Sequence, residues 1–274
     1  MEILLSISSL CMLAVIFLGW RQRSTEGFRF GKNVKVHIWT LLEIAQLFAI
    51  LLIAVGLVIL AHGILHTSKL LETAAFNALF MVASQIFLQA LLLALVLQFL
   101  RHKKISWSEA FGFKATTIPH ALLTAGVTLM AIFLPIVLLA YAAYIIFTQL
   151  GLSTEPQSIV QIFTEVKNFW VRTGLIFTAT VGAPFAEEIF FRGMLYPYLK
   201  KQWGMFHALW ISSIMFAAIH QHAASVLPLF ALAIVLTLLY EWRGNLAACI
   251  AMHASFNALN LAILFLIDKK PSLS

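Results

Sequence analysis

Long apolar runs separated by short polar segments dominate the sequence. A helix needs about 20 apolar residues to cross about 30 Å of hydrocarbon, and eight runs reach or approach that length. Their approximate limits are residues 4–20, 38–65, 74–100, 121–150, 173–199, 205–220, 224–240 and 246–267. Only residues 221–223 separate the short sixth and seventh runs, which predicts a tight helical hairpin. The pattern predicts an all-α fold, a polytopic membrane helical bundle of about eight transmembrane helices.

The composition supports a bilayer as the solvent. Hydrophobic residues make up 62% of the chain and charged residues only 11%, against about 25% charged in soluble proteins. The mean hydropathy is +0.95. The net charge of +7 could suggest a nucleic-acid partner, but no Lys/Arg-rich patch interleaved with aromatic residues occurs. We therefore expect membrane lipid, and no nucleic acid, among the partners.

The positive charges divide unevenly between the two sides of the predicted bundle. If the loops alternate in side, 13 of the 18 Lys and Arg residues fall on the side of residues 21–37 and 101–119. The positive-inside rule then places that side in the cytoplasm and both termini outside. We expect an integral, multi-pass protein, in the inner membrane of a bacterial cell or in the endoplasmic reticulum of a eukaryotic one.

The chain divides by composition into four parts. Residues 1–150 hold the first four spans, 151–172 form an interfacial loop or amphipathic segment, 173–267 hold the last four spans, and 268–274 are a polar tail. The first run lacks a basic segment before it, so we interpret it as a retained span rather than a signal peptide. Cys11 and Cys249 lie in apolar runs, which argues against disulfides and a cysteine zinc site.

Three ionisable residues crowd into the fifth run. Each charge at mid-bilayer costs about 2.5–3.5 kcal/mol on insertion scales, so Glu187, Glu188 and Arg192 must face the bundle interior, water or each other. Residues four apart share a helix face, so Glu188 can pair with Arg192. Glu187 lies above Phe191 instead. We predict that the pair is structural and that Glu187 remains available for chemistry.

Two further motifs repeat the spacing of four. Phe216 and His220 share a face of the sixth run, and His253 and Asn257 share a face of the eighth. At about 1.5 Å per residue these polar groups lie near the depth of Glu187. A single intramembrane histidine is often only a packing residue. Four such polar residues at similar depth favour a shared site.

Three motifs, in this order on separate runs, carry a resemblance to a known family: Glu187-Glu188-x-x-x-Arg192, Phe216-x-x-x-His220 and His253-x-x-x-Asn257. They resemble the CAAX-protease and bacteriocin-processing family, which includes the Ras-converting CAAX endopeptidases and the bacterial Abi proteins. The resemblance covers roughly residues 173–262. It implies an intramembrane glutamic endopeptidase that needs no metal and no cofactor.

The resemblance also implies a role for each residue. Glu187 would be the general base that activates a water, and His220 would hold and polarise that water. His253 and Asn257 would stabilise the oxyanion, and the Glu188–Arg192 pair would be structural support. General chemistry agrees, because a carboxylate in a low-dielectric cavity is a better base near neutral pH. Fixed donors suit a carbonyl that develops negative charge.

Other functions remain open. The chain has no Gly-x-Ser-x-Gly, no candidate catalytic Cys with a His partner and no Asp in the predicted spans, which disfavours serine, cysteine and aspartyl proteases. A zinc protease could use Glu187, His220 and His253, although no His-Glu-x-x-His is present. A proton-coupled transporter and a catalytically silent scaffold or immunity protein are the alternatives outside enzymes. The expected substrate is a peptide or lipidated protein; prenylation and oligomeric state stay open.

Overall fold

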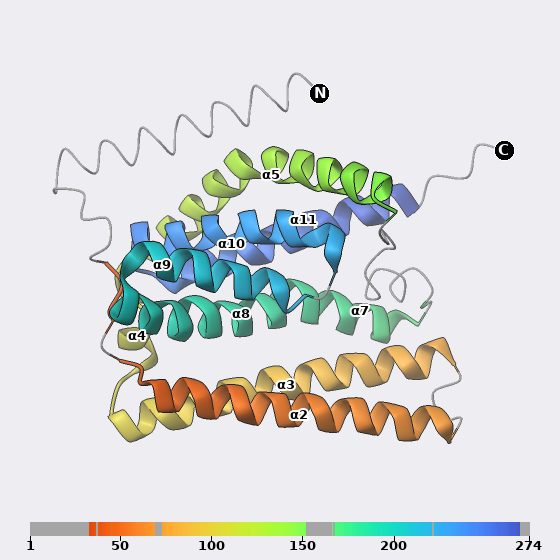
Figure 1. The fold of residues 1–274 in the computed structure, drawn as a ribbon, viewed down its shortest axis with the longest axis horizontal. Coiled ribbons are helices and arrows are strands. Elements are labelled where there is room, and N and C mark those ends of the chain that lie inside the picture. Colours follow the sequence, from red (N-terminus) through yellow and green to blue (C-terminus); the bar gives the residue numbers. More distant parts are fainter. Residues whose placement is uncertain are drawn as a thin grey trace. The chain divides into compact units, whose positions relative to one another are not determined.

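The computed structural model describes residues 33–36, 38–68, 73–151, 166, 168–220 and 222–268, and these are almost entirely helical (Figure 1). No strand occurs among them, so the predicted all-α class is confirmed. The predicted first span, residues 4–20, lies outside the described residues, as do most of residues 151–172.

The helices, with π-helical stretches labelled η, are α2 (Leu41–Thr67), α3 (Ala74–Lys103), α4 (Trp107–Ala110), α5 (Ile118–Gln149), α7 (Phe169–Phe177), η1 (Thr178–Gly182), α8 (Ala183–Glu188), η2 (Ile189–Leu195), α9 (Tyr196–Ala218), α10 (Ala223–Arg243) and α11 (Leu246–Asp268). In this part of the chain, six helical stretches are long and apolar enough to cross a membrane. Five of them agree with predicted runs to within a few residues, and the remaining one, Phe169–Ala218, combines the predicted fifth and sixth runs. The total of about eight spans stays a prediction.

The difference in number has two sources: the first predicted span lies outside the described residues, and the fifth and sixth are joined at Gly204. The predicted fifth and sixth spans form one continuous stretch of 50 residues, Phe169–Ala218. Gly204 interrupts it with φ 78° and ψ 170°, a conformation that glycine adopts without steric cost. The chain then turns back after Gly204 (Figure 1), and the ring of Phe216 packs 5.1 Å from that of Phe191. Residues 188–203 and 205–218 are therefore two antiparallel helical segments joined by a sharp bend.

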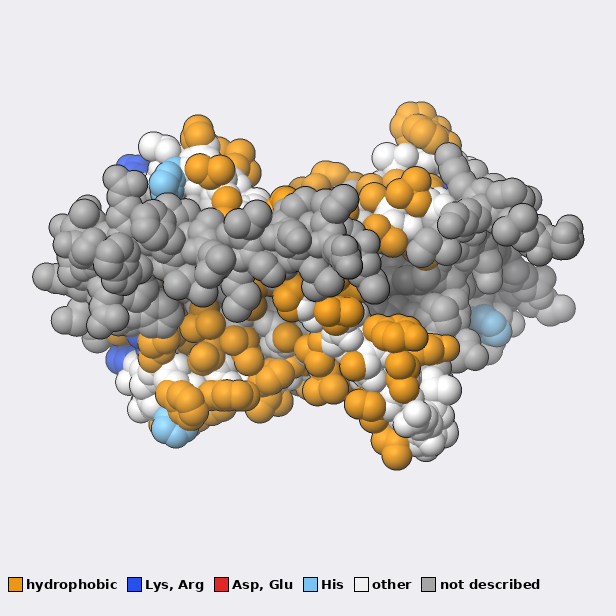
Figure 2. All heavy atoms as spheres, turned by 90° about the horizontal axis from the view of Figure 1, so that it is seen from above, with side chains coloured by type: hydrophobic (Ala, Val, Ile, Leu, Met, Phe, Trp, Pro, Cys, Tyr) orange, Lys and Arg blue, Asp and Glu red, His pale blue; other side chains and the backbone are white. Residues whose placement is uncertain are grey.

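The described surface is largely apolar. Hydrophobic side chains cover most of the described surface in the view of Figure 2. On α2, for example, Leu42 is 66% exposed and Ile53 is 64% exposed. In water such a surface would be unfavourable, whereas lipid tails are an adequate solvent for it. The chain is an integral, multi-pass membrane protein.

The described residues form two compact units. One unit combines residues in the ranges 40–105, 156–187 and 257–274. Its α2 and α3 lie side by side and antiparallel (Figure 1). Lys103 pairs with Glu43 at 2.9 Å, where α3 ends beside the start of α2. Nearer the start of α3, Val82 packs with Leu175 of α7 in a small core.

The other unit combines residues in the ranges 1–39, 106–155 and 188–256. Here α10 packs against both α9 and α5 (Figure 1). Trp210 of α9 and Phe230 of α10 have ring centroids 5.6 Å apart, so the predicted hairpin between the sixth and seventh runs is confirmed. Leu232 and Leu236 of α10 are fully buried.

The segment before α2 is anchored in this unit by Trp39. The Trp39 indole N–H donates to the carbonyl of Gly193 at 2.6 Å, and its ring stacks on Phe111 at 6.3 Å. A Cβ added at Gly193 would lie 2.6 Å from the Phe111 ring. Glycine is therefore required where η2 meets Phe111.

A buried carboxylate lies at the end of α10. Glu241 is fully buried, accepts a hydrogen bond from the Tyr196 hydroxyl at 2.6 Å and pairs with Lys200. The Asn33 amide donates to the carbonyls of Glu241 and Trp242 at 3.1 and 3.0 Å. The predicted seventh run ends one residue before Glu241. In the structure, Glu241 lies inside α10 and pairs with Lys200.

Candidate active site

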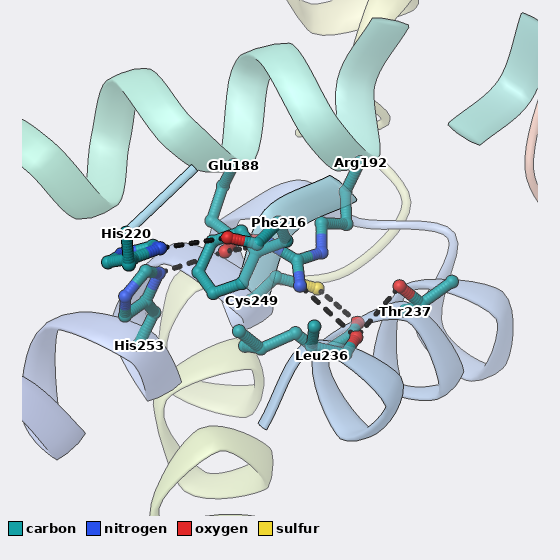
Figure 3. A network of polar contacts seen from close by, with 9 residues as sticks. Glu188, Arg192, Phe216, His220, Leu236, Thr237, Cys249 and His253 are labelled. Atoms are coloured by element: carbon teal, nitrogen blue, oxygen red, sulfur yellow. Dashed lines mark hydrogen bonds and ion pairs between the residues drawn. The ribbon is translucent and has the colours of Figure 1, made fainter. Parts of the chain in front are cut away.

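The centre of the site is a buried ion pair. Arg192 Nη1 lies 2.8 Å from Glu188 Oε1, as the four-residue spacing predicts, and both side chains are almost completely buried. Arg192 Nη2 donates to the carbonyl of Ala233 at 3.1 Å, and its guanidinium lies over the Phe216 ring at 4.6 Å (Figure 3). A buried charge is tolerated when its partners supply such contacts.

The local backbone is irregular around this pair. Glu188 is the last residue of α8 and Arg192 lies inside η2. A second π-helical stretch, η1, precedes α8, and Pro184 at its start lacks a backbone N–H. π-Helical turns insert a residue into the helix and re-aim the side chains around them, and they are frequent at functional sites.

His220 follows the last turn of α9. Its Nδ1 lies 2.8 Å from the carbonyl oxygen of Phe216, and its ring lies 5.0 Å from the Phe216 ring. A carbonyl oxygen can only accept, so Nδ1 carries the hydrogen and the neutral ring has its lone pair on Nε2. His220 is half-buried and is thereby oriented to accept a hydrogen bond through Nε2.

His253, on α11, is buried and belongs to the same network. Its Nδ1 lies 2.9 Å from Glu188 Oε1, and its ring lies 5.8 Å from that of Phe216. Phe216 therefore contacts Arg192, His220 and His253 together (Figure 3). The contact between His253 and Glu188 is absent from the sequence-based prediction, because 65 residues separate the two and no spacing rule links them.

Glu187 and Asn257 belong to the other unit. Glu187 is half-buried at the end of α8, and it too has an interacting partner. The Asn257 amide donates to the carbonyl of Ala179 at 2.9 Å, so one of its two amide hydrogens serves a backbone group. The convergence of Glu187 and Asn257 with the two histidines stays a prediction.

No obvious metal site is present in the described part of the chain. There, no group of three or more His, Cys, Asp or Glu residues is arranged to hold a metal ion. Cys249 is buried and free, with its thiol 3.4 Å from the carbonyl of Leu236. Cys11 lies outside the described residues.

The part of the chain that holds this network matches a known protein family. Residues 169–259 match the model described as type II CAAX prenyl endopeptidase Rce1-like. These residues form an Rce1-like segment. It runs from the start of α7 into α11 and contains all three sequence motifs. The resemblance predicted from those motifs is confirmed over this segment.

Among curated proteins, the chain is similar to the uncharacterized protein YpbD of Bacillus subtilis (strain 168). The two are 37% identical over 78 residues, which is 27% of this chain and 37% of YpbD. The chain thus matches little more than a third of the length of that relative. No solved structure matches the chain.

Proposed function

We propose that this protein is an intramembrane glutamic endopeptidase that needs no metal. The observation that supports this most directly is the buried Glu188–Arg192–His253 network, with His220 beside it, inside the Rce1-like segment. Burying charged groups in a membrane is costly. A scaffold could use apolar residues at these positions and avoid that cost, so the network favours chemistry.

In the proposed reaction, Glu187 takes a proton from a water molecule. The neutral His220 offers its Nε2 lone pair, because Nδ1 donates to the Phe216 carbonyl, and can therefore accept a hydrogen bond from the same water. The water oxygen then bonds to the carbonyl carbon of the substrate, and the carbonyl electron pair moves onto oxygen. A positioned general base of this kind contributes about 10²–10⁴-fold to the rate.

His253 and Asn257 are proposed to stabilise the oxyanion of the tetrahedral intermediate. Removal of one such donor typically costs about 2.7–4 kcal/mol of transition-state stabilisation. When the intermediate collapses, the C–N bond breaks and Glu187 returns its proton to the leaving amine. The proton balance closes without a cofactor.

The proposed substrate is a membrane-associated peptide, with a lipid-modified C-terminal tail as the favoured class. The matching family is described as a prenyl endopeptidase. The helices expose large apolar side chains, so a lipid chain attached to a substrate can remain in the bilayer while the peptide approaches the bundle.

A cleavage assay in proteoliposomes tests the proposal. Quenched-fluorescent peptides with and without a C-terminal prenyl group serve as probes. We expect Glu187→Gln to reduce the cleavage rate about 10²–10⁴-fold, because the base is lost while the side chain keeps its size. Glu43→Gln is the matched control, since this acid lies on α2 and pairs with Lys103, and it should cleave at the parental rate.

Three outcomes would contradict the proposal. Cleavage by Glu187→Gln at the parental rate would remove this residue as the base. Loss of activity in a chelator with recovery on added zinc would favour the metalloprotease. Proton-coupled transport without cleavage would favour the transporter. If the synthetic peptides are poor substrates, mass spectrometry of intact peptides that accumulate with Glu187→Gln identifies better ones.

A further inference from the structure

We propose that Glu188 is a positioning residue for His253, beyond its ion pair with Arg192. Glu188 Oε1 is shared, at 2.8 Å from Arg192 Nη1 and 2.9 Å from His253 Nδ1. The role of this pairing in the reaction rests on the proposed function. The pairing itself can be tested without any cleavage assay.

The arginine fixes the ionisation state of Glu188. An arginine side chain remains charged in proteins, and the nearly complete burial of Arg192 demands a counter-charge beside it. Glu188 is the carboxylate in contact with it. An ionised carboxylate can only accept hydrogen bonds. His253 Nδ1 must therefore donate, which fixes the hydrogen on that nitrogen.

This proton placement constrains what His253 can do. With its hydrogen on Nδ1, the neutral ring has only a lone pair on Nε2, so it would accept rather than donate there. Stabilising an oxyanion requires a donor. His253 can fill the proposed role only when it carries a second proton, on Nε2. Glu188 Oε1, 2.9 Å from Nδ1, is the counter-ion of that doubly protonated ring.

The two histidines thus differ because their Nδ1 partners differ. His220 donates to a neutral backbone carbonyl, so nothing in that contact favours a second proton. His253 donates to a charged carboxylate. The contact with Glu188 therefore gives the two histidines different roles: His220 is suited to holding a water, and His253 is suited to stabilising an anion. The ionisable groups near His253 include Glu188 on α8, Arg192 on η2, His220 across the Phe216 ring on α9, and Cys249 one turn earlier on α11.

The geometry makes Glu188→Gln a clean test of charge. Glu188 Oε2 is buried and has no hydrogen-bond partner within the described part of the chain, so both directed contacts converge on Oε1. A glutamine with its amide nitrogen at the Oε2 position keeps both hydrogen bonds but removes the charge, which leaves Arg192 buried without its counter-ion. Glu188→Asp is the complement, because it keeps the charge but shortens the side chain by about 1.5 Å.

Nitrogen-15 NMR of histidine-labelled protein tests the proposal directly, because it shows which ring nitrogen of His253 carries the hydrogen. His253→Gln identifies the His253 signals by their loss. In the parent we expect the hydrogen on Nδ1, and in Glu188→Gln a changed Nδ1 chemical shift, because the acceptor loses its charge. A parent ring protonated only on Nε2, or His253 signals that do not change in the variant, would overturn the inference even if some variants fold poorly.

Kinetics provide the second readout. We expect Glu188→Gln to lower kcat about 10–100-fold, which is typical when the hydrogen-bond partner of a functional histidine is changed. The change in KM should be much smaller. Tyr196→Phe is the matched control, because it removes another buried hydrogen bond to a carboxylate, that of Glu241, without contact to His253 or Arg192. An unchanged kcat in Glu188→Gln would also overturn the inference. If the NMR result holds but the parent cleaves no peptide, the proposed function fails and the pairing stands.

Discussion

Arg192 has three different kinds of partner within one buried environment. A carboxylate, a backbone carbonyl and an aromatic ring each contact the guanidinium. Arginine suits this position because its planar, delocalised cation can donate in the plane and stack on its face at the same time. Lysine, a compact and strongly hydrated point charge, could not satisfy the same three contacts.

Removal of the arginine alone should destabilise the protein strongly. Arg192→Met leaves Glu188 buried without its cation, which costs about 3–5 kcal/mol. The double variant Glu188→Met/Arg192→Met should be more stable than Arg192→Met, because no uncompensated charge remains. Unfolding by SDS titration in mixed micelles measures both. Lys201→Met, at an exposed position, is the control, and a single variant as stable as this control would contradict the prediction.

At this scale the sequence predicts contacts within a helix better than contacts between helices. The pairing of Glu188 with Arg192 and the approach of Phe216 to His220 follow from a spacing of four on one helix face. The contact of His253 with Glu188 depends on where α11 lies relative to Glu188 and to Phe216 of α9, and no periodicity encodes that. The sequence does not predict the central place of Phe216 in the network for the same reason, because the ring contacts residues of other helices.

Two adjacent residues of η2 are held by close contacts. Arg192 lies in the buried ion pair, and Gly193 meets the Phe111 ring while its carbonyl accepts a hydrogen bond from the Trp39 indole. The close approach leaves no room for a side chain. The position of the ion pair therefore depends on a residue that has no side chain.

Gly193→Ala should destabilise the bundle by about 1–3 kcal/mol, as overpacking typically does. The added Cβ would lie 2.6 Å from the Phe111 ring, so the ring or η2 must shift. Phe111→Leu makes space, and it should cost less in the Gly193→Ala background than in the parent. A double-mutant cycle in thermal unfolding measures this coupling. Additive effects would show that the two residues do not share a constraint.

The helix limits were largely predictable from the sequence, whereas the internal irregularities were not. Hydrocarbon thickness forces long apolar runs, so α2, α3, α5, α10 and α11 lie close to the predicted limits. The π-helical stretches η1 and η2 change the hydrogen-bond pattern without changing hydrophobicity. The bend at Gly204 falls in the predicted gap between the fifth and sixth runs, but its sharpness depends on one backbone conformation.

For the molecule as a whole, the charge bias predicts an orientation that the α2–α3 hairpin makes testable. Ser68, just after α2, and His102, near the end of α3, are both exposed and lie at opposite ends of this hairpin. The excess of Lys and Arg around residues 101–119 places the second end in the cytoplasm.

A membrane-impermeant maleimide added to intact cells should therefore label Ser68→Cys and not His102→Cys. Both variants are made in a background with Cys11→Ser and Cys249→Ala, so that each chain has one thiol. Labelling of both after the cells are opened is the control. The reverse pattern in intact cells would invert the predicted orientation.

The segment from Asn33 to Trp39 finds its partners very late in the chain. Trp39 bonds to a carbonyl 154 residues away, and Asn33 to carbonyls 208 and 209 residues away. A ribosome delivers the N-terminal part first, and closing such long loops is slow. While α2 and α3 are already in the membrane, the Trp39 indole must wait until η2 has been synthesised, and the Asn33 amide must wait until the end of α10 has been synthesised. This fastening is one of the last events of assembly, and a nascent chain halted before residue 241 lacks it.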